Sequence, residues 1–277
     1  MNTNGSNTAA IEIDLLLEAI YRRYGYDFRS YARASIERRI HQFASNVGSD
    51  SIAAMIPRVL HDEEFFSDIV QYFSVGVTEL FRDPHVYRTL RETVLPVLCT
   101  WPHIKIWCAG CATGEEVYSL AIVLAEEELL GRCQLYATDF NDASLARARQ
   151  GVYAAEKMQD ATRRYQQSGG TGSFSDYYHA RYGGVVLDPA LRERITFANH
   201  NLVSDASFGE IHLILCRNVL IYFDRSLQDR ALGLFTESLV HGGFLCLGTK
   251  EDLTFSAVFN SYETVHRNTR IYKKKQE

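Results

Sequence analysis

The first quarter of the chain carries apolar residues at the spacing of helices. One run is Ile13, Leu16, Leu17, Ile20 and Tyr24, and a second is Tyr31, Ile36, Ile40 and Phe43. No alternating strand pattern interrupts residues 11–74. Asp83 before Pro84 suits the N-cap and the first position of a further helix, over roughly 84–98. The first part of the chain is therefore predicted to be all helical.

After Pro102 the pattern changes to short apolar runs that alternate with helices. Strands are expected over 104–108, 134–138, 195–197, 211–216 and 244–247, and helices over 115–130, 141–150 and about 226–240. Two last runs, 263–266 and 270–273, predict a closing antiparallel hairpin. Such alternation is typical of right-handed βαβ units. We predict an α/β fold, a Rossmann-like methyltransferase sheet that is mostly parallel.

The pattern weakens between about 156 and 193. A glycine- and serine-rich loop at 168–173 precedes an aromatic stretch, and Val185 to Leu187 suits one short strand. We interpret this part as a small insertion subdomain. The predicted domains are a disordered N-terminus over 1–10, a helical domain over 11–83, a linker helix over 84–102 and the sheet domain over 103–277.

Composition narrows the classes of partner. The 277 residues are 46% hydrophobic, which is enough for a well-packed globular protein. The net charge of -5 comes without a sustained basic stripe, which disfavours nucleic acid as partner. No apolar run approaches the about 18 to 20 residues of a membrane helix, so membrane insertion is not expected. Six cysteines, mostly in or beside apolar runs, favour reduced thiols in a cytoplasmic protein.

A glycine turn, Gly110 to Gly114, follows the first predicted strand and begins the next helix. Open α/β sheets bind ligands at such turns, because glycine lets the backbone approach and helix amides face the ligand. Glu115 and Glu116 suit the first helical turn but would repel a pyrophosphate. Asp139 ends the second strand, near the spacing at which an acidic residue binds ribose hydroxyls. Together they predict an adenosine cofactor without phosphates, which S-adenosylmethionine fits.

Plainer interpretations stay open. The glycine turn could be an ordinary strand-to-helix connection, and Asp139 could cap the helix that follows. Trp107-Cys108-Ala109-Gly110-Cys111 superficially matches a redox motif, but buried structural thiols are the simpler interpretation. There is no second Cys-x-x-Cys, and the nine histidines are scattered, so we expect no metal site. A packed or capping role is favoured for His200.

Five segments, in order and in spacing, resemble the CheR-type chemoreceptor glutamate methyltransferases. They are Thr78–Pro84, Trp107–Glu116, Ala137–Asp139, Asn201–Leu202 and Cys216–Phe223. The resemblance covers nearly the whole chain. It implies a cytoplasmic class I methyltransferase that uses S-adenosylmethionine, releases S-adenosylhomocysteine and esterifies glutamates in the cytoplasmic helical region of chemoreceptors. A glutamate carboxylate is already ionised at neutral pH, so neither a general base nor a metal is needed.

The resemblance also implies roles for individual residues. Arg82 would contact the methionyl carboxylate or orient the substrate, and Tyr222 would line the site of methyl transfer. The cofactor-binding residues would be Gly76, Thr78, Arg82, Gly110, Glu115, Glu116, Asp139, Asn201, Leu202, Arg217 and Asn218. Gly76 is a departure, because many family members have Asn there.

Receptor docking is the last implied property. Arg29, Arg33, Arg38 and Arg39 are expected on one helix whose basic face would bind the receptor, although a solvated helix face is an open alternative. The insertion does not look like the compact β-subdomain that grips a receptor C-terminal peptide in some relatives, so we predict independence from that tether. Two other functions stay open: a methyltransferase with another substrate, and a signalling module that only binds S-adenosylmethionine.

Overall fold

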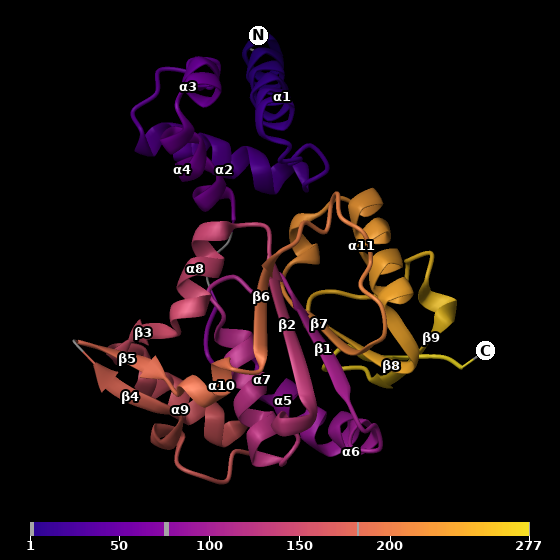
Figure 1. Ribbon diagram of the computed structural model, residues 1–277. Coiled ribbons are helices and arrows are strands. Elements are labelled where there is room, and N and C mark those ends of the chain that lie inside the picture. Colours follow the sequence, from indigo (N-terminus) through magenta and orange to yellow (C-terminus); the bar gives the residue numbers. More distant parts are fainter. Residues whose placement is uncertain (1–2, 75–77, 182, 277) are drawn as a thin grey trace. The chain divides into compact units, whose positions relative to one another are not determined.

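The computed structural model describes residues 3–74, 78–181 and 183–276, with side chains from residue 8 onward. It divides into two compact units (Figure 1). The first consists of Met1–Val75 with Ile221–Gln228, and the second of Gly76–Leu220 with Asp229–Glu277. The segment from residue 78 to 83 therefore lies in the second unit, not in the helical domain predicted to end at residue 83.

Four helices form the first unit. They are α1 (Thr3–Tyr24), α2 (Arg33–Asn46), α3 (Met55–His61) and α4 (Glu63–Phe73). The predicted apolar stripes are buried, as Leu16, Ile20 and Ile40 show. The stretch 3–10, predicted to be disordered, is part of α1. A buried helical segment over 13–20 explains this difference, because adding turns to a formed helix avoids the cost of nucleation.

Residues 221–228 complete the first unit although they come late in the chain. The backbone N–H of Ala32 donates to the Tyr222 carbonyl at 2.8 Å. Tyr31 forms an isolated antiparallel bridge with Phe223, and their ring centroids are 5.2 Å apart. Tyr222 is thereby held within the helical unit.

A seven-stranded sheet forms the centre of the second unit, in the order β6-β2-β1-β7-β8-β10-β9. The strands are β1 (Ile104–Ala109), β2 (Cys133–Asp139), β6 (Ile195–Asn199), β7 (Ile211–Cys216), β8 (Leu239–Leu247), β9 (Tyr262–His266) and β10 (Ile271–Lys274). All neighbours from β6 to β8 pair in parallel, whereas β10 is antiparallel to both β8 and β9. The predicted fold class, with its closing hairpin, is confirmed.

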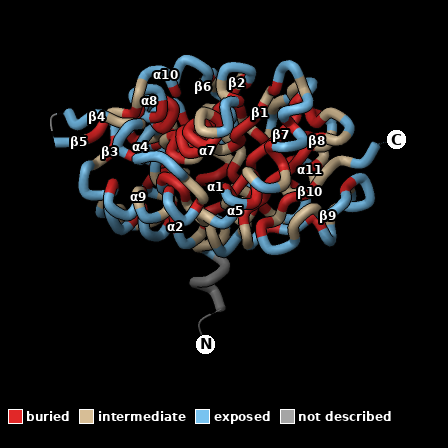
Figure 2. Tube along the Cα trace, turned by 90° about the horizontal axis from the view of Figure 1, so that it is seen from below, coloured by how far each residue is buried: buried red, intermediate tan, exposed pale blue. Residues whose placement is uncertain are grey.

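Helices cover the sheet and connect its strands. They are α5 (Pro84–Thr89), a π-helical segment (Leu90–Val94), α6 (Leu95–Leu98), α7 (Glu115–Glu126), α8 (Asp142–Gln150), α10 (Pro189–Arg192) and α11 (Arg225–Ser238). Figure 2 shows buried positions concentrated along α7 and the neighbouring strands. Every residue of α7 from Val117 to Leu124 is buried, so this helix is fixed firmly against the sheet. No helix in the described part of the chain could span a membrane.

The insertion contains a second, antiparallel sheet of order β3-β5-β4. Its strands are β3 (Val152–Ala154), β4 (Tyr178–Arg181) and β5 (Gly184–Leu187), and α9 (Met158–Gln167) lies between the first two in sequence. The strand predicted over 185–187 is present, with Val185 and Leu187 buried. The expectation that no compact β-subdomain exists is wrong. Sequence patterns missed β3 and β4 because both are short: only Tyr153 is buried in β3, and no residue of β4 is buried.

Candidate active site

The glycine turn joins β1 to α7 under tight steric limits. Gly110 has a φ of +73°, and a Cβ there would lie 2.5 Å from a methyl carbon of Val219. Gly114, the N-cap of α7, has a φ of +93°, and its Cβ would lie 3.0 Å from that of Ala148. The N–H groups of Gly110 and Cys111 both donate to the Thr138 carbonyl, at 2.8 and 2.9 Å. The turn is therefore fixed against the end of β2.

Asp139 supports this turn from the end of β2. Its carboxylate accepts hydrogen bonds from the N–H of Ala112 at 2.9 Å and of Asn141 at 3.0 Å. Burial raises the pKa of Asp139, while the backbone donors oppose the rise. Asn141, not Asp139, caps α8. Because each carboxylate oxygen can accept a further hydrogen bond, binding of ribose hydroxyls by Asp139 is compatible with these contacts.

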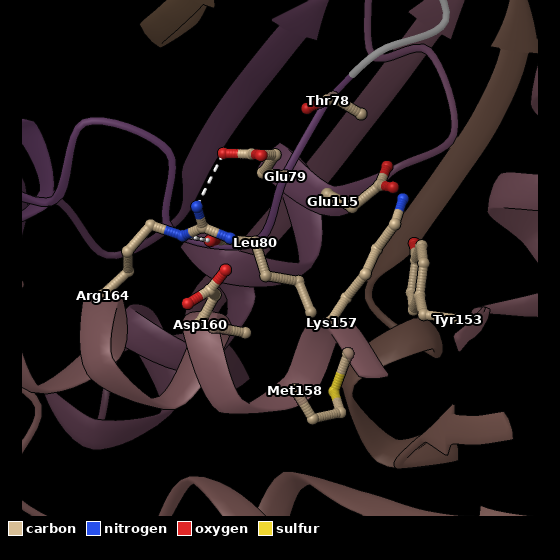
Figure 3. Close-up of a pocket in the computed structure, with 10 residues that line it drawn as sticks. Thr78, Glu79, Leu80, Glu115, Tyr153, Lys157, Met158, Asp160 and Arg164 are labelled. Carbon is tan, nitrogen blue, oxygen red and sulfur yellow. Dashed lines mark hydrogen bonds and ion pairs between the residues drawn. The ribbon is translucent and has the colours of Figure 1, made fainter. Parts of the chain in front are cut away.

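Glu115 lies beside Thr78 in a pocket of the second unit (Figure 3). Its carboxylate accepts a hydrogen bond from the Thr113 hydroxyl at 2.6 Å, and burial raises its pKa. Tyr153 closes the same wall by donating to the Thr113 carbonyl at 2.8 Å. Lys157 reaches toward Glu115 from the far side of the pocket. Two of the predicted cofactor residues, Thr78 and Glu115, thus line one pocket.

Glu116 lies in an ion-pair group that we call the Arg217 cluster, made of Arg217, Glu116 and Asp83. One terminal nitrogen of Arg217 contacts Glu116 and the other contacts Asp83, each at 2.8 Å. The second nitrogen also donates to the Arg82 carbonyl at 3.1 Å. The Arg217 side chain is only 1% exposed. Its charge is therefore paired within the protein itself, and its place among the cofactor-binding residues stays a prediction.

Burial and charge act in opposite directions within this cluster. Burial raises the pKa of Glu116, and the neighbouring charges of Arg217 and Arg82 oppose the rise. Burial alone would lower the pKa of Arg217, but Glu116 and other neighbours raise it above its ordinary value. Arg217 therefore stays charged.

Asn218 follows in a left-handed conformation with a φ of 61°. Its N–H donates to the Glu251 carboxylate at 3.1 Å, and the N–H of Gly248 donates to the same oxygen at 2.6 Å. Sequence reasoning missed Glu251. A usable signal existed, because Glu251 follows the carboxyl end of β8, at the sheet edge where open α/β sheets place ligand-binding residues.

The predicted adenine-flanking pair forms a local turn. The side-chain oxygen of Asn201 accepts a hydrogen bond from the N–H of Val203, and the backbone N–H of Asn201 donates to the Asp205 carboxylate, both at 2.9 Å. Leu202 is buried. His200 packs edge-on against Trp107 at 5.2 Å, which is the packed role that the sequence favoured.

Cys108 and Cys111 are buried and their thiol pKa values are raised by that burial, so redox chemistry at this pair is disfavoured. No group of metal-ligating side chains occurs in the described part of the chain. Gly76 lies outside the described residues.

In the first unit, Tyr222 lies against Arg39. The Arg39 guanidinium is 4.5 Å from the centre of the Tyr222 ring, and Arg39 also donates to the Phe73 carbonyl. Arg39 is buried, and desolvation lowers its pKa. The catalytic role of Tyr222 stays a prediction.

The predicted docking arginines do not form one free basic face. Arg39 is buried, and Arg29 precedes α2 and pairs with Asp27 and Glu18. Arg33 pairs with Glu37 and with an aspartate of α1. Arg38 is exposed. The expectation of a shared docking surface is wrong in this respect, because acidic neighbours and the core engage three of its four members.

Comparisons with known proteins cover both units. The all-alpha domain of the CheR methyltransferases matches residues 11–74, and their SAM binding domain matches residues 76–268. The chain is 50% identical over 264 residues to "Putative methyltransferase Cher3" of Pseudomonas putida, covering 95% of this chain and 97% of that protein. It is 28% identical to the chemotaxis protein methyltransferase of Listeria monocytogenes, covering 84% and 87%. Chemotaxis protein methyltransferase 1 of Pseudomonas aeruginosa is 27% identical, with 89% and 92% covered.

Proposed function

The chain belongs to the CheR methyltransferase family, and we propose that it transfers methyl groups to glutamate side chains in the cytoplasmic helical region of chemoreceptors. It is an S-adenosylmethionine-dependent methyltransferase. The observation that carries the proposed substrate is the match of both family domains, together with full-length similarity to proteins named for chemotaxis. A cytoplasmic location follows from such a substrate.

The residues of the second unit fit a phosphate-free, cationic nucleoside. Glu115 and Glu116 begin α7, and Asp139 ends β2 beside them. Carboxylates at this helix N-terminus disfavour a phosphate and favour a cation. S-adenosylmethionine, when bound, supplies a methyl group activated by its positively charged sulfur. In this proposal Asp139 holds the ribose, Glu116 faces the methionyl part and Arg82 contacts the methionyl carboxylate.

The chemistry requires positioning more than proton transfer. The receptor glutamate is ionised at neutral pH, so its oxygen forms a bond to the methyl carbon while the sulfur–carbon bond breaks. The electron pair of the broken bond remains on sulfur, which leaves S-adenosylhomocysteine as a neutral product. The protein aligns the two reacting atoms, an effect that accelerates bimolecular reactions strongly. We propose that Arg82 orients the methionyl part of the cofactor or the substrate, and the lining role of Tyr222 stays a separate prediction.

Labelled methyl transfer tests the proposed substrate. The chain is incubated with a receptor cytoplasmic fragment and methyl-labelled S-adenosylmethionine, and the receptor is then treated with base. We expect label on the receptor that base releases as methanol, because carboxyl methyl esters are base-labile. Label that resists base would indicate a methyltransferase for another group, and cofactor binding without transfer would indicate a signalling module.

Independence from a receptor C-terminal tether stays a prediction, although its original basis was wrong. Because the β3-β5-β4 sheet is present, binding of a receptor C-terminal peptide to the insertion must be tested directly. We expect equal methylation of receptors with and without their last residues. Micromolar binding of the C-terminal peptide would overturn this expectation.

A further inference from the structure

Asp83 holds an unusual place at the start of α5. It precedes Pro84 at the N-cap position, as the sequence predicted, but its φ is 55° and its side chain makes no capping hydrogen bond within the described chain. Left-handed conformations are uncommon for residues other than glycine. Helix capping therefore does not explain why Asp83 adopts this conformation, and another contact must stabilise it.

The Asp83 carboxylate instead contacts Arg217 at 2.8 Å, across 134 positions of sequence. Arg217 binds the Arg82 carbonyl with the same nitrogen at 3.1 Å. Asp83 and Arg217 therefore hold the peptide unit of Arg82 between them. The Nε of Arg217 is buried without a hydrogen-bond partner among the described residues, so its two terminal nitrogens make the hydrogen bonds that hold Asp83, Glu116 and the Arg82 carbonyl.

Phe81, on the other side of Arg82 in the chain, is also held in place by α7. Phe81 also has a left-handed φ, 54°, and is fully buried. Its N–H donates to the Ser119 hydroxyl of α7 at 2.8 Å, and that hydroxyl donates to the Glu115 carbonyl at 2.6 Å. Arg82 thus lies between two strained residues, both tied to the helix that begins at the glycine turn. Such strain persists only where surrounding contacts impose it.

We propose that Asp83 is a positioning residue for methyl transfer: its ion pair with Arg217 holds the strained turn 81–83 so that Arg82 faces the cofactor. This rests on the proposed role of Arg82 at the methionyl carboxylate. Arg217 also forms an ion pair with Glu116, which lies in the first turn of α7. One buried cation therefore links the Arg82 segment to the cofactor side of α7.

Three substitutions separate positioning from helix capping. Asp83→Asn keeps a side chain that tolerates a left-handed φ but removes the charge. Asp83→Ser supplies a good capping hydroxyl, again without charge. Asp83→Glu keeps the charge on a longer side chain. The matched control is Glu127→Gln, because Glu127 likewise shares an arginine, Arg91, with a second carboxylate in the same unit.

Binding of S-adenosylmethionine is measured by calorimetry, and the urea midpoint is measured for each variant. We expect the Kd to rise about tenfold for both Asp83→Asn and Asp83→Ser, as for loss of one charge-assisted hydrogen bond, and to stay unchanged for Glu127→Gln. In receptor methylation the loss should fall on KM for S-adenosylmethionine more than on kcat, because the contact is made before and during transfer.

Wild-type affinity in Asp83→Ser would overturn the proposal in favour of capping. An equal loss in Glu127→Gln would overturn it in favour of a general effect on the unit. If Asp83→Asn is too unstable to titrate, the other two variants decide: binding that Asp83→Ser weakens and the charged Asp83→Glu restores supports positioning, and equal binding by both variants contradicts it. Calorimetry needs no receptor, so failure of the proposed receptor substrate would leave this test intact.

Discussion

Two arginines with largely buried side chains, one near each end of α7, bind carboxylates in the same way but in different surroundings. Arg217 joins Glu116 and Asp83 near the N-terminus of the helix, and Arg91 joins Glu126 and Glu127 near its C-terminus. Both leave Nε without a hydrogen-bond partner among the described residues. Similar ion pairs therefore do not by themselves mark a functional site.

The difference lies in what each arginine holds. Carboxylates at a helix C-terminus are disfavoured by the macrodipole, so Arg91 offsets a local charge problem and ties α7 to the π-helical segment. Arg217 binds carboxylates where the helix already favours them, and it also fixes the carbonyl of Arg82 between two strained residues. The contrast indicates a structural role for the Arg91 group, and it is the basis on which we propose a positioning role near the cofactor for the Arg217 cluster.

Replacing each arginine tests this contrast, and Arg217→Met should have the largest effect of the variants on the free energy of unfolding. Arg217→Met leaves two carboxylates facing each other in a buried site, and we expect a loss of about 3 to 5 kcal/mol in the free energy of unfolding. Arg91→Met should also destabilise the protein but leave the Kd for S-adenosylmethionine near that of the wild type. Urea unfolding and calorimetry measure the two quantities. Loss of cofactor binding by Arg91→Met, at a temperature where the variant is folded, would remove the distinction.

Asp139 provides the next test, because it supports the glycine turn without an ion pair. Asp139→Asn should weaken cofactor binding about tenfold to a hundredfold, as for the loss of hydrogen bonds to a charged group. The control competitor is an adenosine analogue that lacks the ribose hydroxyls proposed to contact Asp139. It should bind wild type and variant alike, since the contact in question is missing. A variant with wild-type affinity for S-adenosylmethionine would show that Asp139 only braces the turn.

Glu116 should make stability depend on pH. Its pKa is raised in the folded state from the ordinary value of 4.5, so its contribution to stability is full below about pH 4.5 and is lost as pH rises through the folded pKa. The free energy of unfolding of wild type relative to Glu116→Gln should therefore fall as pH increases from about 4.5, by at most about 1.4 kcal/mol per pH unit. A difference that rises with pH would mean that Arg217 outweighs burial.

Arg38 gives the smallest expected effect, in the first unit. It is exposed, whereas Arg39 is buried against Tyr222. Arg38→Glu should lower receptor methylation severalfold at an unchanged Kd for S-adenosylmethionine, because exposed charges act mainly on encounter with a charged partner. Arg22→Glu, an exposed change on α1, is the control. Equal losses in both variants would contradict a specific docking role for α2.

Periodicity predicted what depends on local sequence. The strand, glycine turn and helix around Gly110 were predictable because the apolar spacing and the glycines within residues 104–126 indicate these elements by themselves. Asp139 belonged to the same repeating unit. Even the burial of Arg39 had a local signal, since it lies three positions after Ile36 and on the same helix face.

Long-range pairing was not predictable in this way. The contact between Asp83 and Arg217 spans 134 positions, and nothing near Asp83 in sequence distinguishes it from an ordinary N-cap. Glu251 reaches Asn218 only because β7 and β8 are neighbours in the sheet. The strands β3 and β4 are too short, with Tyr153 as the one buried residue between them, to produce an alternating pattern. In each case the fold, not the local sequence, determines the role.

Mapping the modified atoms tests the central claim most directly. A receptor cytoplasmic fragment is incubated with the chain and S-adenosylmethionine, and its peptides are sequenced by mass spectrometry before and after base treatment. We predict methyl esters on glutamate side chains that base removes, and none on a fragment in which those glutamates are replaced by glutamine. Methyl groups on nitrogen, or cofactor binding with no modified receptor peptide, would contradict the proposed function.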